Sequence, residues 1–265
     1  MRIDVALTPG EAGTGRGAIC VVVDVLRASS SIVSLLDRGA GTVIPVATVE
    51  EARRLARANG LLLAGEERSV TPSDFDFGNR PAQIARADLG GRDVVFVSRN
   101  GTVVLGGLPD ARAVLVGCLL NATACCRAAL DLAQRDGPAG GEVRIVCAGR
   151  DGGFVMDDAV AAGELVERLA GLAAAGGGRL TLGDGAAAAR RLRGSYPDPV
   201  SGLRDSASGR LVSRLGLEED IDYSARTDLS RSVPVLVPAE PPRIERLDER
   251  LVETGRAPSA ATRDD

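Results

Sequence analysis

Short runs of β-branched residues alternate with helix-forming segments along most of this chain. Residues 18–25 have the composition of a fully buried strand, and residues 30–38 form a helical pattern that Gly39 ends. Strands that alternate with helices pair in parallel, and the helices pack on both faces of the sheet. The sequence therefore predicts an α/β protein: a three-layer α/β/α fold with a largely parallel sheet of about six or seven strands.

The same alternation continues to the segment around residue 237. Further strands are predicted over residues 42–46, 61–64, 93–98, 113–116, 143–147 and 233–237. Helices are predicted over residues 48–59, 121–134, 157–174, 184–193 and 201–215, with a short one after Asn100. Thr48 is expected to cap the first of these helices and Gly60 to end it. Residues 66–82 are expected to be irregular because proline and glycine interrupt them.

The composition changes near residue 238. Residues 1–238 are expected to form one α/β domain. Residues 239–265 are rich in proline and charge, and we expect an extension that is partly disordered. Within it, residues 244–253 have a helical pattern and residues 255–265 have the composition of a disordered tail.

The chain of 265 residues contains no histidine, and all 32 of its basic residues are arginine. Without histidine, neither a Ser-His-Asp or Cys-His arrangement nor a histidine-ligated zinc site can form. Without lysine, neither a Walker A loop nor a Schiff base can form. Carboxylates, hydroxyls, amides and arginine remain. These groups suit Mg²⁺ chemistry on a phosphorylated or carboxylated substrate.

The overall charge and the cysteines bear on partners and location. A net charge of −4, without a basic stripe interleaved with aromatics, argues against a nucleic-acid partner. The first residues lack the pattern of a signal peptide, and no apolar run is long enough to span a membrane. The five cysteines are odd in number and mostly lie in apolar segments, which is typical of reduced thiols. We therefore expect a cytoplasmic protein with no membrane partner, and a homodimer only because that is the commonest assembly.

Polar or glycine residues stand at the carboxyl ends of several predicted strands. In open parallel sheets, ligands bind beyond these ends. We therefore expect these segments to converge on one site although they are spread over more than half of the chain. The residues are Asp24, Glu66, Ser98, Asn100, Asn121 and Gly149.

The segment from Asp24 to Ser30 combines a carboxylate, an arginine and the start of a helix. Asp24 is expected to point into the crevice, and the backbone amides near Ser29 and Ser30 to bind an anion. Arg27 offers a fork of donors that suits phosphate, sulfonate or carboxylate. The alternative is that Asp24 only caps the helix and that Arg27 pairs with a surface acid.

Residues 75–81 form a second candidate segment, in which two phenylalanines flank Asp76. We expect Asp76 to be a metal ligand or an acid–base group, and Asn79 to bind a substrate oxygen. The alternative is an Asx-turn in which both side chains hold their own backbone.

Two further loops complete the candidate site. Asn100, Gly101 and Thr102 are expected to cradle a phosphate because the next element is helical, although an ordinary turn is the alternative. Gly149 opens a glycine-rich loop that is expected to approach a ligand, and the acidic pair at residues 157–158 is expected to bind a cation. The alternative for this pair is a favourable interaction with the helix dipole.

Together these motifs resemble the ComB family of 2-phosphosulfolactate phosphatases, Mg²⁺-dependent enzymes of coenzyme M biosynthesis. The resemblance covers about residues 18–237 in colinear order. Arg80 and Arg99 depart from the family's motifs, and they bear on which substrate is used. The matching segments are residues 24–29, 65–66, 75–81, 100–102, 120–122 and 157–163.

The resemblance implies a Mg²⁺-dependent phosphatase that converts 2-phosphosulfolactate, a small anionic substrate, into 3-sulfolactate and phosphate. Arg99 and Arg150 are candidates for binding its carboxylate and sulfonate. The implied catalytic residues are Asp24, Arg27, Glu66, Asp76 and Asn100. The implied substrate-binding residues are Ser29, Ser30, Asn79, Gly101, Thr102, Asn121 and Gly149. The implied Mg²⁺ ligands are drawn from Asp24, Glu66, Asp76 and Asp158.

The sequence leaves two questions open. Asp24 is either a metal ligand or a covalent nucleophile. The protein is this phosphatase, a phosphatase or phospholyase that acts on another small phosphorylated acid, or a catalytically inactive anion-binding α/β module.

Overall fold

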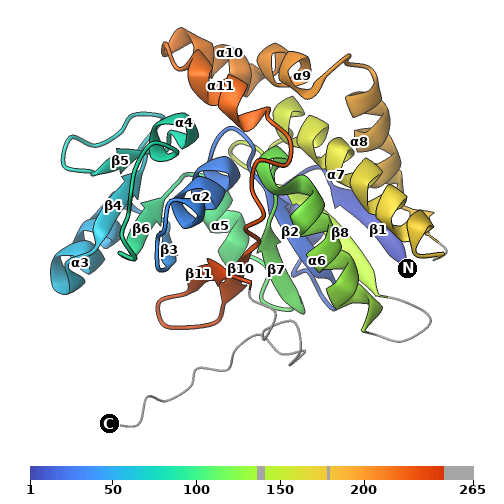
Figure 1. The fold of residues 1–265 in the computed structure, drawn as a ribbon, viewed down its shortest axis with the longest axis horizontal. Coiled ribbons are helices and arrows are strands. Elements are labelled where there is room, and N and C mark those ends of the chain that lie inside the picture. Colours follow the sequence, from blue (N-terminus) through green and yellow to red (C-terminus); the bar gives the residue numbers. More distant parts are fainter. Residues whose placement is uncertain (136–140, 178–179, 248–265) are drawn as a thin grey trace.

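The computed structural model describes residues 1–135, 141–177 and 180–247, and eleven strands in this part of the chain form one sheet (Figure 1). The strands are β1 (Arg2–Ala6), β2 (Ile19–Val23), β3 (Val43–Val46), β4 (Leu62–Gly65), β5 (Phe77–Gly78), β6 (Val94–Val97), β7 (Ala113–Val116), β8 (Glu142–Cys147), β9 (Thr181–Leu182), β10 (Pro234–Val237) and β11 (Arg243–Arg246). Their order across the sheet is β5-β4-β6-β3-β11-β10-β7-β2-β8-β1-β9.

Helices connect most of the strands. They are α1 (Pro9–Ala12), α2 (Ala28–Asp37), α3 (Val49–Asn59), α4 (Pro81–Ile84), α5 (Gly101–Gly106), α6 (Ala122–Gln134), α7 (Met156–Ala175), α8 (Asp184–Gly194), α9 (Pro199–Asp205), α10 (Ala207–Arg214) and α11 (Glu218–Ser224), with a 3₁₀ turn at Leu119–Asn121. As expected, the Thr48 hydroxyl accepts a hydrogen bond from the Glu51 amide and caps α3, and Gly60 ends it at φ 66°.

Two groups of parallel strands make up the sheet, β5-β4-β6-β3 and β7-β2-β8-β1-β9. The antiparallel hairpin β10–β11 lies between them. It is joined to each group through one antiparallel residue pair, Val235 with Leu115 and Ile244 with Val43. The sheet is therefore mostly parallel, as predicted, but it has two parallel groups rather than one.

Strand β2 shows how the layers are built, because all five of its residues are buried. Ile19, Val21 and Val23 pack into one core with α6 and α7, whereas Cys20 and Val22 pack into another with α2 and α5. Successive side chains of a strand point to opposite faces. Helices therefore cover both faces of the sheet (Figure 1), and the predicted three-layer α/β/α architecture is confirmed.

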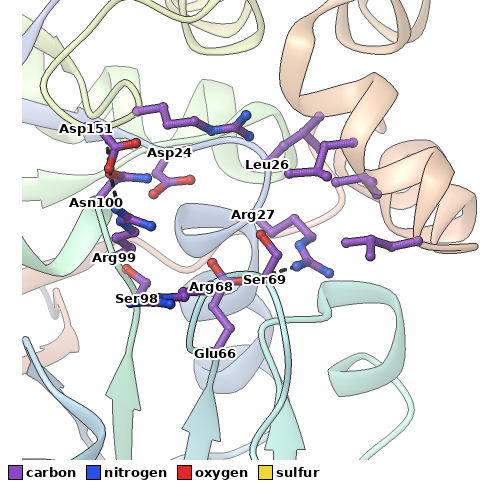
Figure 2. Close-up of a pocket in the computed structure, with 14 residues that line it drawn as sticks. Asp24, Leu26, Arg27, Glu66, Arg68, Ser69, Ser98, Arg99, Asn100 and Asp151 are labelled. Atoms are coloured by element: carbon purple, nitrogen blue, oxygen red, sulfur yellow. Dashed lines mark hydrogen bonds and ion pairs between the residues drawn. The ribbon is translucent and has the colours of Figure 1, made fainter.

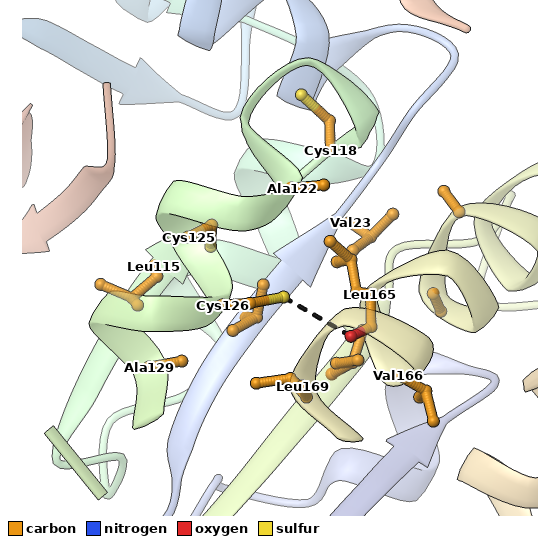
Figure 3. Close-up of a cluster of buried hydrophobic side chains, with 14 of the residues drawn as sticks. Val23, Leu115, Cys118, Ala122, Cys125, Cys126, Ala129, Leu165, Val166 and Leu169 are labelled. Carbon is orange, nitrogen blue, oxygen red and sulfur yellow. Dashed lines mark hydrogen bonds between the residues drawn. The ribbon is translucent and has the colours of Figure 1, made fainter. Parts of the chain in front are cut away.

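Aliphatic side chains and thiols fill this core, because only 2% of the residues are aromatic. Figure 3 shows Val23 of β2 and Leu115 of β7 beside small residues of α6 and leucines of α7. The Cys126 thiol donates to the Leu165 carbonyl oxygen over 3.5 Å. Each leucine buried in this way contributes about 1.5–3 kcal/mol. All five cysteines are free and buried.

Several elements differ from the predictions. The expected helix over residues 201–215 is two helices, α9 and α10, because Ser206 adopts an extended conformation between them and its hydroxyl accepts a bond from the Gly209 amide over 2.8 Å. The strands β1, β5, β9 and β11 were not predicted, so the sheet is larger than expected. Two of them have only two residues, which is too short for an alternating pattern.

The helix expected over residues 244–253 is wrong where the structure describes it, because Arg243–Arg246 form β11. Ile244 is buried there and pairs with Val43 of β3. The sheet thus continues past residue 238, where we expected the domain to end. The rest of that helix and the predicted tail from residue 255 lie outside the described residues, as does most of the glycine-rich loop at 137–141. Among the described helices, none is long and apolar enough to cross a membrane.

Candidate active site

A cavity of about 220 Å³ opens beyond the carboxyl ends of β2, β4, β6 and β8 (Figure 2). Residues that follow strands of both parallel groups therefore line it. Its polar lining residues are Asp24, Arg27, Glu66, Arg68, Ser69, Ser98, Arg99, Asn100, Arg150 and Asp151. Its apolar lining residues are Leu26, Leu211, Val212 and Leu215. The predicted convergence of Asp24, Glu66, Ser98 and Asn100 is thus what the structure shows.

Asp24 follows β2 directly and is 8% exposed. Its carboxylate accepts hydrogen bonds from the backbone amides of Ala28, over 3.3 Å, and of Gly101. These amides belong to the first turns of α2 and α5, so the N-termini of two helices converge on this carboxylate. Only glycine fits at position 101, where the start of α5 comes close to Asp24, because a Cβ there would lie 2.8 Å from the Asp24 Oδ2 atom.

The hydroxyls of Ser29 and Ser30 shape the turn between β2 and α2. The Ser29 Oγ accepts from the Asp24 amide over 2.7 Å, and the Ser30 Oγ donates to the Val25 carbonyl over 3.0 Å. Both side chains are buried and do not line the cavity. The Ser29 amide, predicted to bind an anion, instead donates to the Asp24 carbonyl oxygen over 2.8 Å.

Asp24, Asp157 and Asp158 form a buried group that we call the acid cluster. Burial raises the pKa of Asp24 to about 7, and the negative charges of Glu66 and Asp157 add to this effect. Burial likewise raises the pKa of Asp157 to about 6, although serine hydroxyls oppose the rise. The pKa of Asp158 is raised well above its ordinary value by burial and by the other two carboxylates. Such a cluster either retains protons near neutral pH or is neutralised by a cation.

The two neighbouring carboxylates of α7 are bonded very differently. The oxygens of Asp158 accept from the amides of Val25 and Gly149, each over 2.9 Å. Asp158 therefore ties the end of β2 to the end of β8, and it has no oxygen directed into the cavity. The Oδ1 atom of Asp157, in contrast, is buried and has no hydrogen-bond partner among the described residues.

The guanidinium of Arg27 is 5% exposed and lies between two carboxylates. It contacts Glu66 over 3.0 Å and Asp220 over 3.3 Å. Asp220 belongs to α11 and also accepts from the Ala82 amide over 3.2 Å. Burial raises the pKa of Asp220, although the charge of Arg27 opposes this. Sequence reasoning missed Asp220, because nothing distinguishes it from its acidic neighbours in the segment 218–222.

The loop after β6 lies at the cavity as predicted, with Asn100 on its wall. The Asn100 Oδ1 atom accepts from the Asp151 amide over 3.1 Å. The Thr102 hydroxyl donates to the Ser98 carbonyl over 2.7 Å, and the Thr102 amide donates to the Ser98 hydroxyl. Thr102 therefore stabilises the loop. The side-chain NH₂ group of Asn100 has no hydrogen-bond partner in the described part of the chain and is available to a ligand.

Asp76 does not reach the cavity. It is exposed, and its Oδ2 atom accepts from the Leu63 amide over 2.8 Å at the outer edge of the sheet. Asn79 is buried, and its Oδ1 atom accepts from the Ser31 hydroxyl over 2.8 Å. Both side chains hold other elements in place, and these contacts are not the Asx-turn given as the alternative, because the partners Leu63 and Ser31 are remote in the sequence.

Asn121 and Gly149 also have structural contacts. The Asn121 side chain accepts from the Cys118 amide and donates to the carbonyls of Val116 and Ser232, so its hydrogen-bonding groups are used internally. Gly149 adopts φ 64°, and its amide donates to Asp158. Neither residue lines the cavity.

Sequence reasoning also missed Arg68, Ser69 and Asp151, and the apolar wall from α10. Arg99 and Arg150, the expected anion-binding arginines, both line the cavity. The Arg99 Nε atom lies 3.0 Å from Asp151, and Arg150 donates to the Ser208 hydroxyl over 3.3 Å.

The predicted set of four Mg²⁺ ligands is not gathered in one place. In the described ranges, no three His, Cys, Asp or Glu side chains lie close enough to hold a metal ion between them. Asp24 and Glu66 do face the same cavity. Mg²⁺ is commonly held by one or two carboxylates together with water and substrate phosphate oxygens, so this pair fits such an ion.

The fold and the cavity define an α/β protein whose polar site, with buried acids and several arginines, lies at the carboxyl ends of its strands. The model of the 2-phosphosulpholactate phosphatase family matches residues 6–238. The chain belongs to this family, which confirms the resemblance seen in its motifs.

Relatives from several bacteria are similar over nearly their whole length. One from Deinococcus radiodurans is 38% identical over 224 residues, which cover 84% of this chain and 89% of that protein. One from Thermotoga petrophila is 35% identical and covers 89% and 95% of the two chains, and one from Thermus thermophilus is 35% identical and covers 89% and 94%. Each of the three carries the name "Probable 2-phosphosulfolactate phosphatase".

Proposed function

We propose that this protein hydrolyses the phosphate ester of 2-phosphosulfolactate and releases 3-sulfolactate and phosphate. The names of its relatives support this substrate. The observation that carries the proposal is Asp24, a buried carboxylate held by the amides of two helices at a cavity lined by four arginines. A site of this charge suits a substrate with several anionic groups.

Arg27 and Asn100 would stabilise the phosphoryl group in the transition state. Glu66 and Asp220 fix the guanidinium of Arg27, while its other N–H groups have no partner among the described residues and can donate to a ligand. The bond from the Asp151 amide to the Asn100 oxygen leaves the NH₂ group of Asn100 as a donor. Rigid donors of this kind are effective because they need no reorganisation when charge develops.

Mg²⁺ is the cofactor we propose, with Asp24 and Glu66 as its protein ligands. When bound, the ion would neutralise phosphoryl charge and polarise the ester. The raised pKa of Asp24 supports this placement, because burial and neighbouring carboxylates leave negative charge there without sufficient compensation.

The test is phosphate release from synthetic 2-phosphosulfolactate by the purified protein, with Mg²⁺ and with EDTA. We expect turnover with Mg²⁺, loss with EDTA, and 3-sulfolactate as the organic product. An unsaturated product would identify a phospholyase. Release from other phosphorylated hydroxyacids, but not from this one, would assign another substrate. Absence of release from all of them would favour an anion-binding module.

We also propose that the protein works in the cytoplasm, without a nucleic-acid or membrane partner. Five free, buried thiols and a net charge of −4 support this. A homodimer remains our expectation for the assembly, and sedimentation analysis of the purified protein checks it.

A further inference from the structure

Arg68 and Ser69 stand at the tip of a tight turn that carries them to the cavity (Figure 2). The amide of Glu67 donates to the Val70 carbonyl over 2.9 Å, and the amide of Val70 donates back over 3.0 Å. Arg68 has φ 51° and Ser69 has φ 67°, so both central residues are left-handed. Turns of this kind favour Asn-Gly or Asp-Gly, because side chains at positive φ are disfavoured.

A second turn at the cavity follows that usual preference. The backbones of Arg150 and Gly153 are bonded to each other over 3.0 and 2.9 Å, and the central residues are Asp151 at φ 50° and Gly152 at φ 78°. Of the four non-glycine residues with positive φ in the described ranges, three line this cavity: Arg68, Ser69 and Asp151. Disfavoured backbone conformations persist where a side chain is needed in one place, which makes the Arg-Ser turn a candidate for function.

Arg68 differs from the other three arginines of the cavity. Arg27 pairs with two carboxylates, Arg99 pairs with Asp151, and Arg150 contacts Ser208. Within the part of the chain that the structure describes, the guanidinium of Arg68 makes no hydrogen bond or ion pair. Its full set of donors is therefore available to a ligand.

Arg68 also lies where the cavity continues into a second one. This neighbouring cavity of about 260 Å³ shares Glu66, Arg68, Ser98 and Arg99 with the first and extends to the start of α3. Figure 2 shows Arg68 apart from Asp24, in the direction of Glu66 and Ser98, which also line the second cavity. A substrate whose phosphoryl group lies at Asp24 would therefore direct its far end towards Arg68.

We propose that Arg68 is a specificity-determining residue that binds the anionic group furthest from the phosphate ester. This inference rests on the proposed function, and in 2-phosphosulfolactate that group is the sulfonate. A guanidinium offers several N–H donors to a tetrahedral oxyanion and stays charged at every working pH. The phosphoryl group itself is bound elsewhere, so Arg68 selects the substrate without taking part in the chemistry.

The experiment compares two substrates that differ only in the sulfonate: 2-phosphosulfolactate and 2-phospholactate. For Arg68→Gln we expect KM for the sulfonated substrate to rise about 10-fold or more with kcat little changed. For 2-phospholactate, kcat/KM should change less than about 2-fold. Arg68→Lys keeps the charge and should recover part of the loss. Arg54→Gln removes an exposed charge from α3, outside both cavities, and serves as the matched control.

An equal loss on both substrates, or an unchanged KM for the sulfonated one, would overturn the inference. Calorimetric binding of 3-sulfolactate to the wild type and to Arg68→Gln separates it from the proposed function. If the wild type released no phosphate, the proposed function would fail. A roughly 10-fold weaker binding to Arg68→Gln would still support Arg68 as the anion-binding residue, and equal binding would overturn that as well.

Discussion

The buried and the exposed parts of the site are built in different ways, and of the acid cluster only Asp24 lines the cavity. The acid cluster of Asp24, Asp157 and Asp158 is buried beneath helices and held by backbone amides and serines. In contrast, Arg68, Arg99 and Arg150, which we call the arginine rim, are exposed or half-buried and come from loops and turns. Burying carboxylates is costly, whereas exposed arginines cost little. This contrast indicates that Asp24, the member of the acid cluster at the cavity, serves the chemistry and that the arginine rim selects the substrate.

The largest expected effect is on the buried side. Asp24→Asn keeps the size of the side chain but removes its charge, so turnover should fall roughly 10²–10⁴-fold. The melting temperature should stay the same or rise, because a buried charge is relieved. Phosphate release and calorimetry on the same preparation check both statements. Asp131→Asn, an exposed change on α6, is the control. Wild-type turnover by Asp24→Asn would contradict the assignment of Asp24 to the catalytic site.

Substitution of Asp158 tests whether part of the acid cluster stabilises the fold. Asp158→Ala leaves the buried amides of Val25 and Gly149 without their acceptor, and we expect a loss of about 2–4 kcal/mol in the free energy of unfolding. Asp157→Ala should cost less, since one oxygen of Asp157 has no partner to lose. Urea unfolding of the two variants measures the difference. Equal losses would show that the amide bonds of Asp158 contribute little.

The pH dependence of the free energy of unfolding provides a further test of the buried acid cluster. The pKa of Asp157 is about 6 in the folded chain and near its ordinary value of 3.8 in the unfolded one. The folded chain therefore holds this proton more tightly, and the resulting stability is present below about pH 4 and lost as the pH rises to about 6.

Asp157→Asn cannot ionise, so its stability relative to the wild type should rise across this pH window. The gain should be on the order of 2 kcal/mol, measured by urea unfolding in EDTA. The exposed variant Asp131→Asn should follow the wild type at every pH. Parallel curves for Asp157→Asn and the wild type would mean that Asp157 is ionised throughout.

The smallest effect concerns the rim. Ser69→Gly removes a side chain from a left-handed position, and it should stabilise the chain by about 0.5–1 kcal/mol. Gly152→Ala, in the other turn, should destabilise it by a similar amount. Melting temperatures of the two variants should therefore move in opposite directions. A shift in the same direction would show that backbone conformation does not decide the stability of these turns.

The site residues that the sequence predicted correctly are those whose positions follow from the topology of the sheet. Asp24, Glu66 and Asn100 follow strands, and the carboxyl ends of those strands meet at one place. Asp76 was misplaced because the irregular segment around it gave no register, and the structure uses it at the sheet edge. Arg68 could not be identified as a site residue from the sequence, because its position depends on a turn that arginine and serine disfavour. Asp220 contacts Arg27 from a helix remote in the chain, and no local sequence pattern predicts such a contact.

The strands at the centre of the sheet are the last of its strands to be synthesised. β10 and β11 join the two parallel groups, yet they occupy residues 234–246. Domains form from the N-terminus as a nascent chain leaves the ribosome. Here each parallel group can assemble during translation, but the two can be linked through the hairpin only once the final segment has emerged. A chain truncated before residue 234 would therefore lack the hydrogen-bonded link between the two groups, although α2 and α5 pack in one core with strands of both.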